Sequence, residues 1–140
     1  MTHLFIINPA AGSRDRTEKY TKQIRKVCDA RGLTYRIEVS AAPGDCRRIA
    51  REAAESGEEY RIYACGGDGT LGEVANGMAD CPYAELGIIP CGTGNDFVRN
   101  FAPKANFHDI AAQLDGKLIE LDLLRVNDGY CVNMVNIGFD

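Results

Sequence analysis

The sequence lacks several features that would assign it to a common class of protein. It has no apolar run of about 18 residues, the length that a transmembrane helix requires. Its six cysteines include no Cys-x-x-Cys pair, which excludes the usual zinc spacings and favours buried, reduced thiols. The first residues show no basic segment and no cleavage pattern. We therefore expect no signal peptide and a cytoplasmic location.

The chain also lacks an excess of positive charge. It has 16 Lys and Arg against 20 Asp and Glu, giving a net charge of −4, which argues against nucleic acid as the main partner. Hydrophobic residues make up 45% and charged residues 26%, the mixture of a soluble globular protein rather than a fibrous or disordered one. A length of 140 residues predicts one domain.

Stretches with strand and helix periodicity alternate along most of the chain. Strands are predicted at Leu4–Asn8, Thr34–Ser40, Tyr60–Cys65 and Leu86–Pro90, and helices around 20–28, 46–54, 71–78, 96–101 and 110–114. Gly32 and Gly57 are expected to end the first two helices. Strands that alternate with helices predict an α/β fold of βαβ units, with a mainly parallel sheet and helices on both faces.

The last part of the sequence changes character. Lys117–Asn127 and Tyr130–Gly138 are apolar, β-branched runs joined by Asn127-Asp128-Gly129, a strong hairpin signal. We expect an antiparallel β-hairpin there, with an apolar face that nothing else in the chain covers. Uncovered apolar area predicts self-association through the 117–138 hairpin. The sequence stops soon afterwards at Asp140, which we interpret as truncation within a larger fold.

A glycine-rich segment follows the third predicted strand. Gly66, Gly67 and Gly69 surround Asp68, and a helix is expected directly afterwards. Glycines between a strand and a helix let backbone amides approach a phosphate, and a carboxylate beside phosphate suits Mg²⁺. Thr70 and Glu73 have the spacing of a capping box, which predicts that Thr70 caps this helix. The alternative is an ordinary tight turn with a normal cap.

Two further segments are expected at the same edge of the sheet. Pro90-Cys-Gly-Thr-Gly-Asn-Asp-Phe97 follows the fourth strand, and Asn8-Pro-Ala-Ala-Gly12 follows the first. The carboxyl ends of parallel strands line one crevice, so all three segments should face a single cleft. For Asn8-Pro9 the alternative is a plain turn signal. No Gly-x-x-x-x-Gly-Lys-Ser/Thr motif occurs, which excludes a P-loop enzyme.

Taken together, these three motifs resemble the nucleotide-binding domain of the diacylglycerol kinase catalytic family. The resemblance covers essentially the whole chain: Asn8-Pro-x-x-Gly12, Gly66-Gly-Asp-Gly-Thr-x-x-Glu73-Val-x-Asn-Gly77 and Pro90-x-Gly-Thr-Gly-Asn-Asp96-Phe. NAD kinase shares the Gly-Gly-Asp-Gly loop, whereas Gly-Thr-Gly-Asn-Asp is the lipid-kinase feature. Gly72 departs from the family pattern, where Asn is usual, and Cys91 replaces a common Leu.

The resemblance implies a set of site residues. Nucleotide contacts would come from Asn8, Pro9, Ala10, Ala11, Gly12, Ser40, Gly66, Gly67, Asp68, Gly69, Thr70, Leu71, Gly72, Glu73, Gly92, Thr93 and Asn95. Asp68 would be the catalytic residue of this chain. Asp68, Asp96 and Asp122 would hold Mg²⁺, directly or through water.

The resemblance also implies a function, an ATP- and Mg²⁺-dependent kinase that phosphorylates a lipid hydroxyl, diacylglycerol-like, at a membrane surface. Residues 1–140 would be its nucleotide-binding domain. A C-terminal β-sandwich that carries the catalytic base would be absent, so this fragment alone would be inactive. The alternatives are an NAD kinase-like enzyme with a soluble acceptor, a non-catalytic nucleotide-binding module and a dehydrogenase domain.

The segment Arg14–Arg31 is locally basic, with seven Lys and Arg against three Asp and Glu. The default interpretation is a solvated helix face. The alternative is attraction to anionic lipid headgroups, which would place the protein at the membrane periphery.

Overall fold

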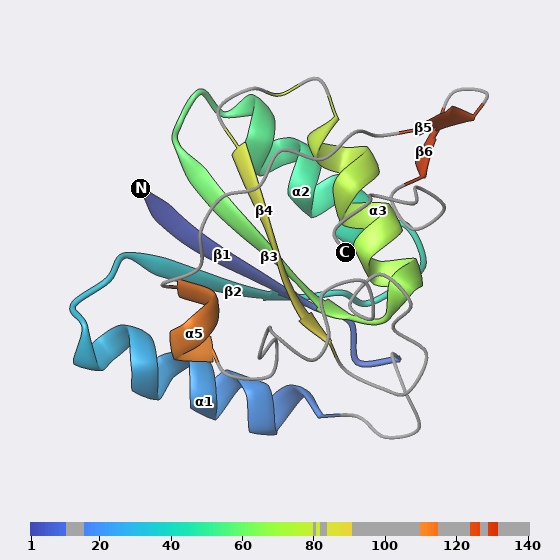
Figure 1. Ribbon diagram of the computed structural model, residues 1–140. Helices are drawn as coiled ribbons and strands as arrows, with labels where there is room; N and C mark the ends of the chain where they lie inside the picture. The colour runs from blue at the N-terminus through green and yellow to red at the C-terminus, as the bar shows by residue number, and fades with distance from the viewer. Residues whose placement is uncertain are drawn as a thin grey trace, which may run out of the picture.

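The computed structural model describes residues 1–10, 16–79, 81, 84–90, 110–114, 124–126 and 129–131. A four-stranded parallel sheet forms its centre, in the order β2-β1-β3-β4 (Figure 1). The strands of this sheet are β1 (Thr2–Ile7), β2 (Tyr35–Val39), β3 (Tyr60–Gly66) and β4 (Ala84–Pro90). The helices are α1 (Thr17–Ala30), α2 (Asp45–Glu55), α3 (Asp68–Met78) and α5 (Ile110–Leu114). The predicted α/β fold is confirmed.

Helices cover both faces of the sheet, and the central strand is buried on both sides. Leu4 and Ile6 of β1 pack with the cluster beneath α2 and α3. Phe5 and Ile7 point the other way, into the cluster beneath α1 and α5. Successive side chains of a strand alternate between faces, so a strand covered on both faces needs the unbroken apolar run that β1 has. Figure 1 shows the two helical layers on either side of the sheet.

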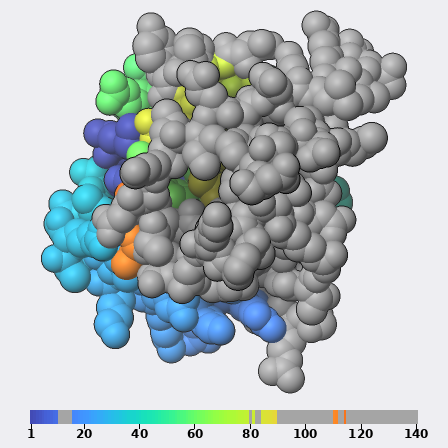
Figure 2. Space-filling view, in the orientation of Figure 1, coloured from blue at the N-terminus to red at the C-terminus, as the bar shows by residue number. Residues whose placement is uncertain are grey.

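Several local predictions are confirmed. Gly32 and Gly57 follow α1 and α2 with φ of +64° and +84°, the left-handed conformation that glycine adopts readily at a helix end. Cys28, Cys46 and Cys65 are buried free thiols, and Cys81 is partly buried. None of the helices in the described part of the chain is long and apolar enough to cross a bilayer. In Figure 2, α1 lies along the outer surface of the molecule.

The C-terminal region is described only in part. β5 (Leu124–Val126) and β6 (Gly129–Cys131) form a short antiparallel pair, with Val126 opposite Gly129. The rest of the predicted hairpin and the helix predicted at 96–101 lie outside the described residues. The hairpin over its full length, and self-association through it, therefore stay predictions.

The close packing of α2 against α3 depends on a glycine. A methyl group at Gly77 would lie 2.9 Å from Cβ of Ala50, closer than real Cβ atoms approach. Arg51 of α2 also donates hydrogen bonds of 3.2 Å to the carbonyl oxygens of Asn76 and Ala79, at the end of α3. The two helices are therefore held together where a side chain at position 77 would separate them.

We predict opposite effects for alanine at two glycines of α3. Gly77→Ala should lower the free energy of unfolding by about 1–3 kcal/mol, because it overpacks the contact with Ala50. Gly72→Ala should raise it by about 0.5–1 kcal/mol, because a Cβ there meets no described atom within 4 Å and alanine favours the helix. Urea denaturation midpoints measure both. Equal effects of the two substitutions would contradict the packing that we describe.

Candidate functional site

Four parallel strands end side by side at the carboxyl edge of the sheet. The Ser40 amide, just after β2, donates to the Ile7 carbonyl at 2.9 Å. The Asn8 amide, just after β1, donates to the Cys65 carbonyl of β3 at 3.1 Å. β4 ends beside β3, with Pro90 opposite Gly66. The segments expected to form one cleft therefore start from the same edge.

The strand order identifies a particular position on this edge. β2 and β3 lie on opposite sides of β1, α1 covers one face of the sheet, and α2 and α3 cover the other. Along the chain, β1 is followed by α1 on one face of the sheet and β3 by α3 on the other, which is the arrangement of a switch point. Open α/β sheets bind ligands at such a switch point. The sequence did not reveal this position, because it depends on the spatial order of the strands.

The Asn8 side chain bridges the switch point. Its Nδ2 donates to Oγ1 of Thr70 at 3.0 Å, and its Oδ1 accepts the Ala10 amide at 3.0 Å. Oγ of Ser40 lies 3.5 Å from the same Oδ1. Thr70 and Ser40 are 2% and 7% exposed, so these polar groups are almost inaccessible to water. One side chain thus joins segments from β1, β2 and α3.

The start of α3 differs from the prediction. The helix begins at Asp68, and the residue at the cap position is Gly67, which is extended (φ −97°) and has no side chain with which to cap the helix. The predicted capping box of Thr70 and Glu73 is wrong. Thr70 is the third helical residue and accepts from Asn8, and Oε1 of Glu73 accepts the Gly44 amide at 2.7 Å. Both side chains therefore bond to residues distant in the sequence, and not to the backbone amides of their own helix end as a capping box requires.

The glycines around Asp68 serve different purposes. A Cβ at Gly66 would lie 2.6 Å from Cβ of Thr70, so glycine is needed there to admit the threonine. A Cβ at Gly69 or Gly72 would meet no atom within 4 Å among the described residues. No described side chain therefore covers the backbone of the first turns of α3 at these two positions. Such a surface allows a ligand to approach the main chain closely.

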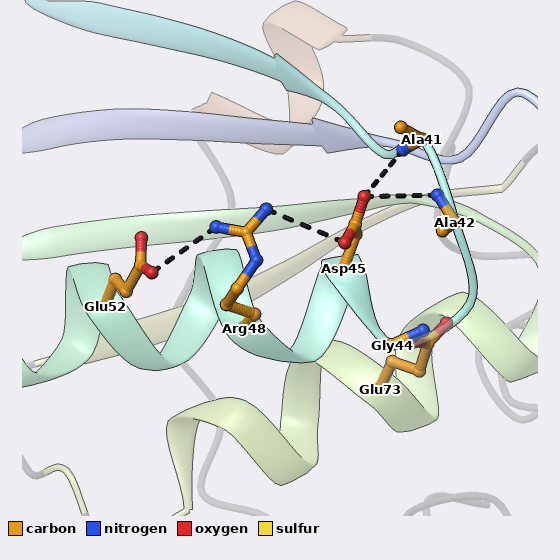
Figure 3. Close-up of polar contacts among 7 residues, drawn as sticks. All are labelled: Ala41, Ala42, Gly44, Asp45, Arg48, Glu52 and Glu73. Carbon is orange, nitrogen blue, oxygen red and sulfur yellow. Dashed lines mark hydrogen bonds and ion pairs between the residues drawn. The ribbon is translucent and has the colours of Figure 1, made fainter.

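The turn between β2 and α2 is held by carboxylates (Figure 3). Oδ2 of Asp45 accepts the amides of Ala41 and Ala42 at 2.8 and 3.1 Å. The hydrogen bond from the Ala41 amide is the main cause that holds the pKa of Asp45 below its ordinary value. Because that pKa is depressed, the carboxylate stabilises the turn above its ordinary pKa and loses this effect as the pH falls through the lowered one.

Cys46 lies just inside α2 and is 1% exposed. Burial raises the pKa of its thiol, so Cys46 is a neutral core group and a poor nucleophile.

The structure describes part of the expected site. Asn8, Ser40 and Thr70 are in contact, and Pro9 and Ala10 form the turn that follows Asn8. The side chain of Leu71, also expected in the site, is 3% exposed and packs in the core beneath α2 and α3, and its amide donates to the Gly67 carbonyl at 3.0 Å. The expected residues outside the described part are Ala11, Gly12, Gly92, Thr93, Asn95, Asp96 and Asp122.

The acidic residue of the glycine segment is partly exposed. Asp68 is the first residue of α3, at the end of the helix where the macrodipole is positive. Within the described ranges, no group of three His, Cys, Asp or Glu side chains is close enough to hold a metal ion by itself. A metal at this edge would need ligands from the substrate or from the rest of the chain.

A hollow of about 340 Å³ lies elsewhere, near the starts of β2 and β3. Its lining includes Arg36, Arg48, Glu52 and Tyr60. Arg36 pairs with Glu38 at 2.9 Å, and Arg48 pairs with Glu52 at 3.3 Å, so neighbouring carboxylates already balance both cations. This hollow is a poor site for an anionic ligand.

We predict energetic coupling across the switch point. In a double-mutant cycle of Asn8→Ala and Thr70→Val, the coupling energy should be about 1 kcal/mol, the usual value of a hydrogen bond. Denaturant unfolding of the four proteins measures it. A control cycle of Asn8→Ala with Glu52→Ala should be additive within about 0.5 kcal/mol, because Glu52 forms an ion pair with Arg48 on the surface of α2. Additivity in the first cycle would contradict the bridge.

Comparison with known proteins identifies the family. Residues 2–126 match the model of the diacylglycerol kinase catalytic domain. The chain is 35% identical to "Probable lipid kinase YegS-like" of Yersinia enterocolitica and 33% identical to the protein of that name from Pectobacterium atrosepticum, covering 99% and 97% of this chain.

Solved structures give the same result. The crystal structure of a diacylglycerol kinase from Bacillus anthracis is 30% identical, with a TM-score of 0.70 over 92% of this chain. The chain spans less than half the length of these proteins, 46% of both curated relatives and 44% of the solved chain. These similarities agree with the parallel sheet and with the glycine segment at its carboxyl edge. The chain belongs to the diacylglycerol kinase catalytic domain family of lipid kinases.

Proposed function

We propose that the chain is the nucleotide-binding part of a kinase that transfers the γ-phosphoryl group of ATP to a lipid hydroxyl, with Mg²⁺ as cofactor. The observation that carries the proposal is the pair of glycines at 69 and 72, in the first turns of α3 beside the switch point, where no described atom would meet a Cβ, in a member of a lipid kinase family. Diacylglycerol or a similar lipid is the proposed acceptor.

The start of α3 fits a polyphosphate. The first amides of a helix have no acceptors within the helix, and the macrodipole favours anions there. Glycine at 69 and 72 removes the side chains that would keep a phosphate away from the backbone. The Asn8–Thr70 hydrogen bond fixes the loop after β1 relative to this helix. The chain would therefore hold the phosphates with main-chain groups on a prearranged edge.

Asp68 fits a role at the metal. Mg²⁺ in nucleotide sites binds through one or two carboxylates together with phosphate oxygens, so a single described carboxylate at the start of α3 is consistent with it. Asp96 and Asp122 are the other proposed carboxylates. The ion would supply positive charge to offset the charge that develops on the phosphoryl group.

Phosphoryl transfer depends mainly on alignment and charge. In this proposal the chain's own residues bind the triphosphate and keep it oriented, and Thr93 and Asn95 complete the cleft. Because the chain spans less than half of its relatives, we propose that the base that accepts the proton of the lipid hydroxyl lies in the remainder of the protein.

Helix α1 is the proposed contact with the membrane surface. Its exposed basic residues, with those at its ends, are Arg16, Lys19, Lys22, Arg25, Lys26 and Arg31. Each basic residue near an anionic leaflet contributes about 1 kcal/mol of attraction. The Lys22–Glu18 pair, 3.0 Å long, is largely exposed and would oppose this attraction only weakly. We propose a cytoplasmic enzyme that binds peripherally to the membrane.

The test is radiolabelled ATP with the full-length protein and two acceptors. We expect label in diacylglycerol presented in phosphatidylglycerol vesicles, none in NAD, and co-sedimentation of the protein with these vesicles. Asp68→Asn should lower the rate by at least about 100-fold, since a metal contact contributes several kcal/mol to the transition state. Glu52→Gln removes one exposed carboxylate of α2 and should leave the rate unchanged.

The same assay separates the alternatives. Label in NAD alone would indicate an NAD kinase-like enzyme. ATP binding without transfer to either acceptor would indicate a non-catalytic module. Wild-type transfer by Asp68→Asn would remove the metal role. Transfer by residues 1–140 alone would place the base within this chain, and binding to neutral and anionic vesicles alike would remove the role of α1.

A further inference from the structure

Two side chains of α3 hold the loops that surround its start. Thr70 accepts from Asn8 after β1, and Glu73 accepts from Gly44 at the start of α2. Residues three apart lie on one face of a helix, so both contacts come from the same side of α3. The position of this helix therefore sets the positions of two separate segments.

The contact of Glu73 is short and directed at the backbone. Oε1 lies 2.7 Å from the Gly44 amide, the length of a hydrogen bond to a charged acceptor. Gly44 has a φ of +90° and directly precedes α2. Residues other than glycine rarely adopt this left-handed conformation. The amide that Glu73 binds therefore belongs to a sharp turn that a glycine makes possible. Figure 3 shows Glu73 reaching from α3 to this turn.

The turn so held is Ser40–Asp45. Asp45 closes it from within through the amides of Ala41 and Ala42, whereas Glu73 provides a hydrogen bond to it from outside. Ser40, at its beginning, lies beside Asn8. With both carboxylates in place, three backbone amides of the turn are occupied by the protein itself. A phosphate group would have to compete with these carboxylates to bind there.

We propose that Glu73 is a positioning residue: it keeps the Ser40–Asp45 turn against the start of α3 by accepting the Gly44 amide, and it contacts neither the triphosphate nor the metal. This role rests on the proposed function for its effect on ATP, but the contact itself does not. The motif in which Glu73 lies would otherwise suggest that its negative charge serves the nucleotide site directly.

The two roles differ in what they require of residue 73. Positioning requires a side chain of the right length that ends in a hydrogen-bond acceptor, and glutamine also provides one. A metal or phosphate role requires the charge. Glu73→Gln removes the charge and keeps an acceptor, and Glu73→Ala removes both. Glu52→Ala is the matched control, because it removes an exposed carboxylate that pairs with Arg48 on the same helix.

The experiment combines hydrogen exchange of the peptide containing residues 40–46 with steady-state kinetics, both on the full-length protein. For Glu73→Ala we expect about tenfold faster exchange in this peptide and an about tenfold higher KM for ATP, the size of one hydrogen bond to a charged group, with kcat within about twofold. Glu73→Gln should stay within about threefold of wild type in both, and Glu52→Ala should match wild type.

Loss of transfer in Glu73→Gln, with exchange of the turn unchanged, would overturn the proposal in favour of a role for the charge. A wild-type rate of hydrogen exchange in Glu73→Ala would overturn it as well, because the hydrogen bond to Gly44 would then not stabilise the Ser40–Asp45 turn. If the wild-type protein neither bound ATP nor transferred phosphate, the proposed function would fail, and the exchange data alone would still decide whether Glu73 holds the turn.

Discussion

The hydrogen bond from Asn8 to Thr70 is the contact on which the carboxyl edge of this sheet depends. It spans the position where the strand order reverses, between the ends of β1 and β3. The same asparagine accepts the Ala10 amide and lies beside Ser40. The other described contacts among these segments include backbone hydrogen bonds at the strand ends and the hydrogen bond from the Gly44 amide to Glu73. A cleft made of separate loops needs such a connection to keep its shape.

The layers of the fold give this contact its stability. β1 is covered on both faces, which places Asn8 at the end of a rigid central strand. Gly77 lets α3 approach α2 closely, and Gly66 admits Thr70 against the end of β3. Among the residues that the structure describes, the glycines at 69 and 72 have no such neighbours, and no side chain covers the main chain of α3 there. Within one short motif, Gly66 and Gly77 thus allow close packing, whereas Gly69 and Gly72 allow a ligand to approach the main chain.

The sequence predicted the parts of this arrangement that follow from local patterns. Apolar runs and helical spacing located the four strands of the sheet and the helices α1, α2 and α3, and Gly32 and Gly57 marked two helix ends. The capping box failed because Thr70 and Glu73 bond to Asn8 and Gly44, whose positions depend on the strand order. The switch point was missed for the same reason. Local sequence indicates which elements form, whereas partners across the sheet decide what a polar side chain contacts.

The central claim is that ATP binds at the carboxyl edge, between the loops after β1 and β3. Amide chemical shifts of the isotope-labelled full-length protein, titrated with a non-hydrolysable ATP analogue and Mg²⁺, test it most directly. We expect the largest changes at the amides of Asn8 and Ala10, of Ser40 and of Gly66–Gly69. We expect little change around Arg36, Arg48 and Tyr60, where the charges are already paired. Changes centred on that hollow, with the carboxyl edge unaffected, would contradict the account.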